Sequence, residues 1–369
     1  MTSQKTTPNL SFSVFKLSAG LLCGCGLLGG GRAESIDLSH EFLGSADVSF
    51  NESSVGLATT EGNPRINISF TGARTTVDYE PAEVDLLSVP RKRIEDRKAL
   101  SGVIRWDLTE LTNGIIGGGT YRGFSGIRSI WIDEYYRQLF ESVPAYIDAD
   151  PRGWNVLAGA RWSYFPSSAY LQVIMAHQQD HVSPGYEPQI FAPLLRGRDR
   201  LTSNSIRVST ENILTPRIRT RLELSTTQTT GRETRYSIQG SCNWAAAENY
   251  TLRAVLASVA EDPEFDAFSA AVTLERDWDS TWFAGLSVRT YFDSGEVVDP
   301  LIPSTAASPL RTIHTSISLR RQGIRSAVKL DAGFYQTDHA ALPTPSQHFA
   351  RLYRDRDWMH IQLSWEWRI

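Results

Sequence analysis

The chain has 369 residues, a net charge of −4 and an aromatic content of 10%. This length fits either several soluble domains or one large barrel, and the acidic balance gives no support for general nucleic-acid binding. No run of about 18 apolar residues follows the N-terminal region, which excludes helical membrane spans.

Residues 1–33 have the pattern of an export signal. Two lysines are the only charges before the apolar segment 17–28, and small residues around Ala33 predict cleavage before Glu34. An alternative interpretation is a lipoprotein signal with a lipidated Cys25. We rank it second, because the apolar run continues beyond this cysteine, where a polar tether is expected.

Residues 34–63 are predicted to be an N-terminal lead-in segment, and residues 64–369 one β domain. In this second part apolar and polar residues alternate in successive segments separated by turn signals, as in strands with two different faces. The fourteen expected strands are 66–70, 100–108, 115–121, 152–164, 169–178, 205–214, 218–229, 235–244, 250–259, 268–278, 281–292, 312–320, 325–335 and 360–369.

The last ten residues alternate without exception, over a length close to the roughly 9–11 residues with which a tilted strand crosses a bilayer. The apolar face consists of Ile361, Leu363, Trp365, Trp367 and Ile369. This ending resembles the C-terminal strand of bacterial outer-membrane β-barrel proteins, although their final residue is usually aromatic. The resemblance implies an all-β, transmembrane antiparallel up-and-down barrel in the outer membrane. It also implies that these five residues are part of a signal for the barrel-assembly machinery.

A C-terminus in the periplasm orders the connections into two classes. The short ones (109–114, 166–168, 215–217, 245–249, 279–280 and 321–323) fall on the periplasmic side. The long ones (80–98, 124–151, 179–204, 293–311 and 336–354) fall outside, as is usual in such barrels. The segment 46–57 also alternates. It is either part of the lead-in or, with another strand near residue 40, part of a barrel of sixteen strands. We favour fourteen.

The connection 124–151 carries an apolar residue at every fourth position, including Trp131 and Tyr135, which predicts a short amphipathic helix. Such a helix either caps the barrel rim or folds into the lumen as a constriction. We favour the rim.

The polar strand faces are predicted to line the lumen. The candidate lining residues are Arg105, Arg161, Arg207, Arg219, Arg221, Arg235, Arg253, Arg289, Arg320, Lys329, Glu275 and Glu366. An excess of Arg and Lys in a pore favours anions. The alternative is that these cations pair with acids on neighbouring strands and simply fill the barrel.

Enzymatic chemistry has weak support. The dipeptides Asp180-His181 and Asp338-His339 stand where strands enter external loops, and His314 lies beside Ser316 on a polar face, but none forms a recognisable catalytic motif. The seven histidines have no spacing typical of a metal site, so no metal and no cofactor is predicted.

A basic run, Arg91-Lys92-Arg93 with Arg97-Lys98, is expected in an external loop. It is either solvated or in contact with lipopolysaccharide phosphates.

These observations predict a porin-like outer-membrane barrel that passes small polar or anionic solutes, surrounded by outer-membrane lipid and lipopolysaccharide. One alternative is a non-conducting surface protein whose external loops bind a partner. A distant alternative is a hydrolase at the barrel rim.

Overall fold

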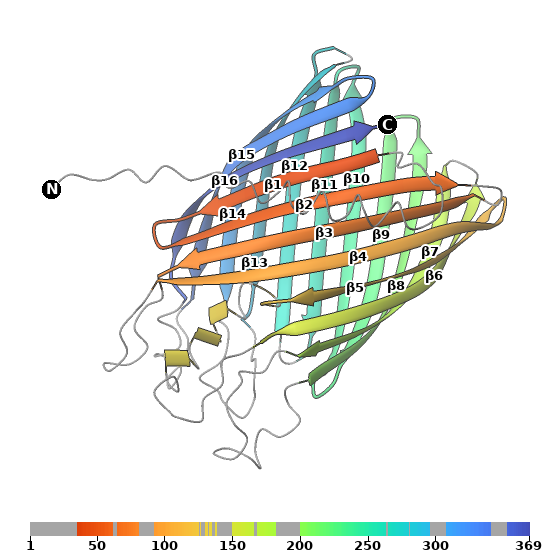
Figure 1. Ribbon diagram of the computed structural model, residues 1–369. Coiled ribbons are helices and arrows are strands. Elements are labelled where there is room, and N and C mark those ends of the chain that lie inside the picture. Colours follow the sequence, from red (N-terminus) through yellow and green to blue (C-terminus); the bar gives the residue numbers. More distant parts are fainter. Residues whose placement is uncertain are drawn as a thin grey trace.

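The computed structural model is a closed antiparallel β-barrel of sixteen strands, in which each strand pairs with its neighbours in sequence and β1 pairs with β16 (Figure 1). The structure describes residues 35–61, 65–80, 92–124, 126, 130–131, 133–134, 137–138, 150–165, 168–181, 200–262, 265–279, 281–295, 308–340 and 353–369. The expected signal peptide and its cleavage site between Ala33 and Glu34 lie outside these residues and stay predictions.

The strands are between 10 and 17 residues long. In chain order they are β1 (Ser35–Gly44), β2 (Val48–Glu61), β3 (Ile66–Tyr79), β4 (Arg93–Thr109), β5 (Thr112–Arg122), β6 (Arg152–Phe165), β7 (Ala169–His181), β8 (Arg200–Thr215), β9 (Ile218–Thr229), β10 (Thr234–Ala247), β11 (Tyr250–Glu261), β12 (Phe265–Asp277), β13 (Trp282–Asp293), β14 (Leu310–Gln322), β15 (Ser326–His339) and β16 (Arg356–Arg368).

The preference for fourteen strands is wrong, and the alternative of sixteen is confirmed. Residues 35–61, assigned to a lead-in, form β1 and β2 of the barrel wall. The segment 46–57 was recognised as a possible strand and β1 was not, and two local features weaken the pattern of both. His40 interrupts the apolar face of β1, and the same face of β2 carries the polar Ser49, Asn51 and Ser53.

The last strand finds its partner in the first. β1 and β16 pair along the whole of β1, from Ser35 opposite Arg368 to Gly44 opposite Met359. This register sets Ile36 beside Trp367 and therefore continues the apolar outer face of β16 across the seam. Closure also leaves neither terminal strand with an unpaired edge.

The outer face is an apolar belt. Directly paired residues share a face, and the pairings align Leu224 with Ile238, Val272 with Val288, and Leu330 with Leu363. Large apolar side chains on this face are exposed from β3 to β16, as expected for a surface that meets lipid. Among the residues that the structure describes, no helical stretch has the length and hydrophobicity of a membrane span.

The connections at the two ends differ in length. We call the end that carries the C-terminus the periplasmic end and the opposite end the external end (Figure 1). At the periplasmic end β8 and β9 are joined by residues 216–217 and β10 and β11 by residues 248–249, whereas 182–199 and 340–355 connect strands at the external end. The predicted sorting of connections is therefore confirmed. An exception is the turn 45–47 between β1 and β2, a short external link.

Gly123 ends β5 at the external end. Its φ of 105° lies in the left-handed region, and a Cβ at this position would collide with the backbone of Asp96 and Arg97. Its amide donates a hydrogen bond of 2.8 Å to the carbonyl of Pro151. Glycine is therefore required here, and its hydrogen bond to Pro151 brings the end of β5 beside the start of β6.

Candidate functional site

The inward face of the barrel holds the predicted lining residues. The pairing registers carry this face from strand to strand, since direct partners point the same way. All the candidates lie on the side opposite the apolar belt: Arg105, Arg161, Arg207, Arg219, Arg221, Arg235, Arg253, Arg289, Arg320, Lys329, Glu275 and Glu366.

Most of these cations have a carboxylate partner. Glu223 accepts from Arg221 at 2.7 Å and lies 3.2 Å from Arg207, so that one acid serves cations on β8 and β9. Arg253 pairs with Glu275 at 2.7 Å across β11 and β12. Further pairs join Arg219 to Glu211, Arg235 to Glu261, Lys329 to Asp331, and Arg368 to Glu366. Over much of the wall the inward charge is thus balanced locally.

Four inward arginines differ. Among the described residues, no carboxylate lies within ion-pair distance of Arg105, Arg161, Arg289 or Arg320. Arg161 stacks over the ring of Tyr170 at 3.8 Å. Its planar guanidinium is thereby oriented while its charge is not neutralised. At these four positions no neighbouring carboxylate of the described residues balances the positive charge.

Helical residues of the connection 124–151 pack against the inner side of the external rim. Trp131 is 4% exposed and packs edge-on against Tyr79 of β3, with ring centroids 5.4 Å apart. Tyr79 belongs to the inward face, as do the buried Val77 and Trp358. Tyr79 is the last residue of β3 at the external end, so these contacts place the described helical residues on the inner side of the rim, in agreement with the preferred position. These residues pack against the lumen wall.

Glu134 anchors the same segment. It is 1% exposed, accepts a hydrogen bond of 2.7 Å from Arg137 and one of 3.3 Å from the Tyr79 hydroxyl, and lies 3.6 Å from Arg93 of β4. Arg137 also donates to Glu95 of β4 at 2.9 Å. A buried carboxylate with several charge-assisted partners fixes the segment in one orientation.

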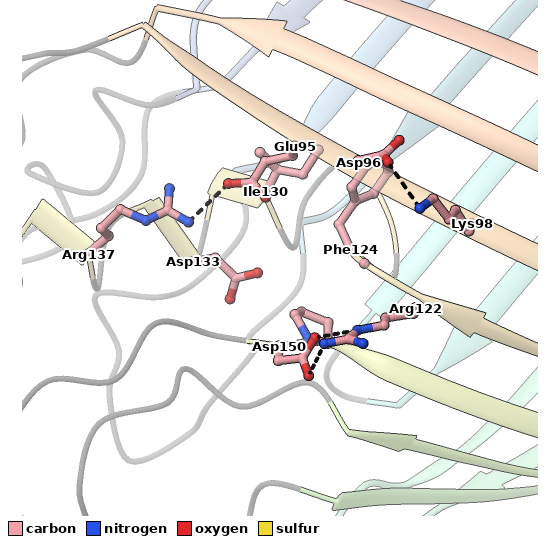
Figure 2. Close-up of a pocket in the computed structure, with 11 residues that line it drawn as sticks. Glu95, Asp96, Lys98, Arg122, Phe124, Ile130, Asp133, Arg137 and Asp150 are labelled. Carbon is pink, nitrogen blue, oxygen red and sulfur yellow. Dashed lines mark hydrogen bonds and ion pairs between the residues drawn. The ribbon is translucent and has the colours of Figure 1, made fainter. Parts of the chain in front are cut away.

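A polar pocket of about 310 Å³ opens beside this segment (Figure 2). It is formed between the external ends of β4 and β5 and the helical residues Ile130, Asp133 and Arg137. Both cations and carboxylates line it. Dashed contacts in the figure join Arg137 to Glu95 and Arg122 to Asp150.

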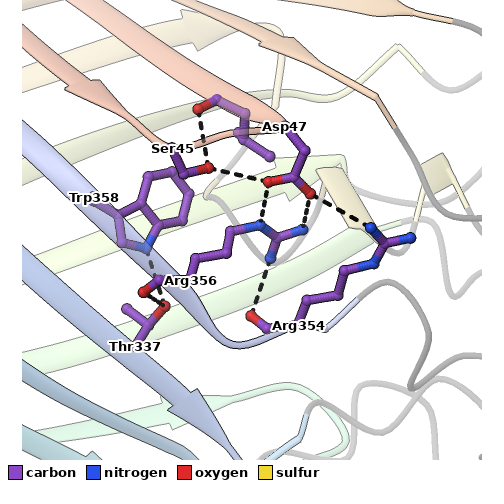
Figure 3. Close-up of polar contacts among 7 residues, drawn as sticks. Ser45, Asp47, Thr337, Arg354, Arg356 and Trp358 are labelled. Atoms are coloured by element: carbon purple, nitrogen blue, oxygen red, sulfur yellow. Dashed lines mark hydrogen bonds and ion pairs between the residues drawn. The ribbon is translucent and has the colours of Figure 1, made fainter.

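A second anchor ties the β1–β16 seam at the external end (Figure 3). Arg356 of β16 forms a two-pronged pair with Asp47 in the β1–β2 turn, with both N···O distances 2.9 Å. The guanidinium lies 5.1 Å from the ring of Trp131, which connects the seam with the helical segment. Partial burial alone would raise the pKa of Asp47, but the hydrogen bonds and charge of Arg356 hold it below its usual value.

The expected basic loop is not a loop in its described part. β4 begins at Arg93, so Arg93, Arg97 and Lys98 are strand residues, and the predicted external connection 80–98 is shorter than expected. Arg93 and Arg97 face inward and Lys98 outward. Arg91 lies outside the described residues.

The candidate hydrolase residues do not assemble into a catalytic group. Asp180 and His181 end β7, and Asp338 and His339 end β15, on strands separated around the barrel by seven others. Asp180 instead accepts a hydrogen bond of 2.8 Å from Tyr121. His314 and Ser316 share the inward face, but no hydrogen bond joins them.

One cluster was missed from the sequence. His314, Asp331 and His360 converge on the inward face, with candidate metal-ligand atoms within 4.8 Å of one another. Local histidine spacing gave no sign of it, because the three residues come from β14, β15 and β16. The strand registers that align them are a tertiary property.

No protein-family model and no characterised protein sequence matches the chain. Among solved structures it is similar to CdiB from Acinetobacter baumannii, with a TM-score of 0.53 and 8% identity over 90% of this chain. The chain spans 60% of that protein. It is also similar to OprD of Pseudomonas aeruginosa (TM-score 0.47, 7% identity, 91% and 95% of the two chains) and to the KdgM porin (0.32, 8%, 91% and 99%). At these identities the likeness to CdiB shows the fold alone, a closed antiparallel β-barrel.

Proposed function

We propose that the chain forms an outer-membrane pore for small polar or anionic solutes. The observation that carries this proposal is a closed barrel of sixteen strands whose inward face carries numerous polar and charged side chains. Barrels of about sixteen to eighteen strands are wide enough to leave an aqueous channel, whereas about eight strands leave an interior filled by side chains. A lumen of this width can pass hydrated solutes without any rearrangement of the strands.

The anionic preference comes from Arg105, Arg161, Arg289 and Arg320. The other cations among the predicted lining residues have acid partners, and paired charges contribute little net field at a distance. The four arginines keep their charge toward the lumen, where low-dielectric walls focus it. We therefore expect a modest rather than a strict selectivity.

The described helical residues narrow the external mouth on one side. Trp131 and Glu134 hold them against β3 and β4, so solutes that enter from outside pass this segment before they reach the arginines. We propose that it sets the size limit of the pore.

The test uses the full chain refolded into lipid vesicles and planar bilayers. We expect vesicles to swell in small sugars or amino acids and the bilayer to show discrete conductance steps. Replacement of the four arginines by Gln should shift the reversal potential toward cations. The matched control is Arg122→Gln, on the outward face. A folded protein with no conductance and no swelling would reject the pore and favour a non-conducting surface protein.

We also propose two partners. The outward C-terminal residues Ile361, Leu363, Trp365, Trp367 and Ile369 form the signal for the barrel-assembly machinery. Near the external end the outward face carries Arg74, Lys92 and Lys98, which are positioned to meet lipopolysaccharide phosphates. Loss of lipopolysaccharide retention after charge removal at these three positions supports the second partner, and unchanged retention rejects it.

A further inference from the structure

Two buried histidines and an aspartate meet on the inward wall next to the barrel seam. His314 of β14 and His360 of β16 are 6% and 5% exposed, and Asp331 of β15 lies between their strands. Histidines this deeply buried require polar partners, because an unpaired buried nitrogen loses its bonds to water without compensation.

Part of that requirement is not met within the protein. The Nε2 atom of His314 and the Nδ1 atom of His360 are both buried and have no hydrogen-bond partner. The ring of His314 is held in place by stacking on Tyr335, with centroids 3.7 Å apart and an interplanar angle of 4°. Gly333 leaves space beside it, since a Cβ at that residue would come within 2.9 Å of the free Nε2 atom.

The distances fit a metal ion. The His360 Nδ1 atom lies 3.5 Å from Asp331 Oδ1, and all three side chains offer a ligand atom within 4.8 Å of the others. Zinc bonds to nitrogen and oxygen of about 2.0–2.2 Å at tetrahedral angles separate two ligands by roughly 3.4 Å. The His360–Asp331 pair already has this spacing, and small side-chain rotations would bring in His314.

A fourth residue, Glu41, contacts the ring nitrogen of His360 that points away from Asp331. The His360 Nε2 atom lies 3.1 Å from a carboxylate oxygen of Glu41 on β1. A histidine that donates one ring N–H to a carboxylate directs the lone pair of its other nitrogen toward a metal, and this arrangement is usual around metal-bound histidines. The unpartnered Nδ1 atom is the one that faces Asp331.

We propose that His314, Asp331 and His360 bind one divalent transition-metal ion of the zinc class, with Glu41 as the residue that orients His360. Two imidazoles and a carboxylate suit Zn²⁺, Ni²⁺ or Cu²⁺ better than Mg²⁺ or Ca²⁺. Two carboxylates offset the ion's charge, while Arg289, the register partner of His314, opposes it. Three protein ligands leave a further coordination position, as in zinc sites that also bind a water or solute. Through Glu41 the site would also brace the β1–β16 seam.

Direct binding tests the proposal without reference to the pore. The full chain, refolded in detergent with an affinity tag that lacks histidine and freed of metal by a chelator, is titrated with Zn²⁺. Bound metal is then counted per chain by elemental analysis. We expect one Zn²⁺ per chain, at least a tenfold loss of affinity for His314→Gln and His360→Gln, and about a 10–100-fold loss for Glu41→Gln. The control is His177→Gln, an outward histidine bonded to Asn204, which should bind as the wild type does.

Cobalt gives a readout on the unaltered protein. Co²⁺ in a site of low coordination number should produce intense visible absorption, which Zn²⁺ displaces. Heat-modifiable gel mobility shows that each variant is folded. A folded wild type that takes up no Zn²⁺ would overturn the proposal, and so would histidine variants that bind it unchanged. Either result would indicate that His360 simply bridges Glu41 and Asp331.

Discussion

Replacement of Asp47 by Asn tests whether the external seam is held by a buried charge pair. Among the described residues, two arginine–aspartate pairs have nearly the same geometry. Arg356 meets Asp47 with both distances 2.9 Å, and Arg122 meets Asp150 at 3.0 and 3.1 Å. They differ in exposure. The Arg356 and Asp47 side chains are 7% and 19% exposed, whereas Arg122 and Asp150 are 75% and 51% exposed.

The difference in burial sets the expected magnitudes. In the Asp47→Asn variant the buried Arg356 loses its counter-charge, and hydrogen bonds to charged groups contribute about 1.5–3 kcal/mol each. Removing one partner of a fully buried pair costs about 3–5 kcal/mol. Since Asp47 keeps some contact with water, we expect a loss of about 2–4 kcal/mol in the free energy of unfolding. For Asp150→Asn we expect a loss of about 0–1 kcal/mol, as for other exposed pairs.

Reversible denaturant unfolding of the refolded barrel in lipid vesicles, followed by tryptophan fluorescence, measures both values. The Arg356→Lys variant adds a check, because Lys keeps the charge but cannot form the two-pronged contact. It should fall between the wild type and Asp47→Asn. Equal losses for Asp47→Asn and Asp150→Asn would refute the reasoning, since geometry alone would then determine the contribution.

Three further results are expected. Because the pKa of Asp47 is lowered on folding, its contribution is fully present above the pKa of the unfolded state and disappears as the pH falls through the lower folded value. The stability gap between wild type and Asp47→Asn should therefore be constant near neutral pH, begin to shrink as the pH falls to about 3.8 and vanish below the lower folded pKa. A gap that stays constant into strong acid would contradict this. Trp131→Ala should remove about 3–5 kcal/mol of packing from the helical segment and raise single-channel conductance, with the outward Trp154→Ala as a control that leaves conductance unchanged. Deletion of residues 126–146 should raise conductance further, and an unchanged value would exclude a role for this connection in the constriction.

The wall of the barrel was largely predictable from the sequence. A strand of a membrane barrel alternates between lipid and lumen, so that β9 and β16 can be recognised from their own residues. The predicted strand 218–229 coincides with β9 (Ile218–Thr229). β1 was not recognised, because His40 interrupts its apolar outward face, and without β1 the alternating segment 46–57 of β2 was left out of the barrel.

The contents of the lumen were less accessible. The inward direction of an arginine follows from strand parity, but its partner depends on the register between strands, which local sequence does not determine. Glu223 therefore could not be assigned to Arg221 and Arg207. In the same way the helical periodicity at Trp131 was visible, whereas its position on the inner side of the rim depends on contacts with Tyr79, a distant residue.

The most direct measurement of the central claim is single-channel recording with the purified, refolded chain in a planar bilayer under a salt gradient. We predict discrete conductance steps, a reversal potential with modest anion preference, and loss of that preference when Arg105, Arg161, Arg289 and Arg320 are replaced by Gln. A folded barrel that inserts and conducts no current would contradict the account.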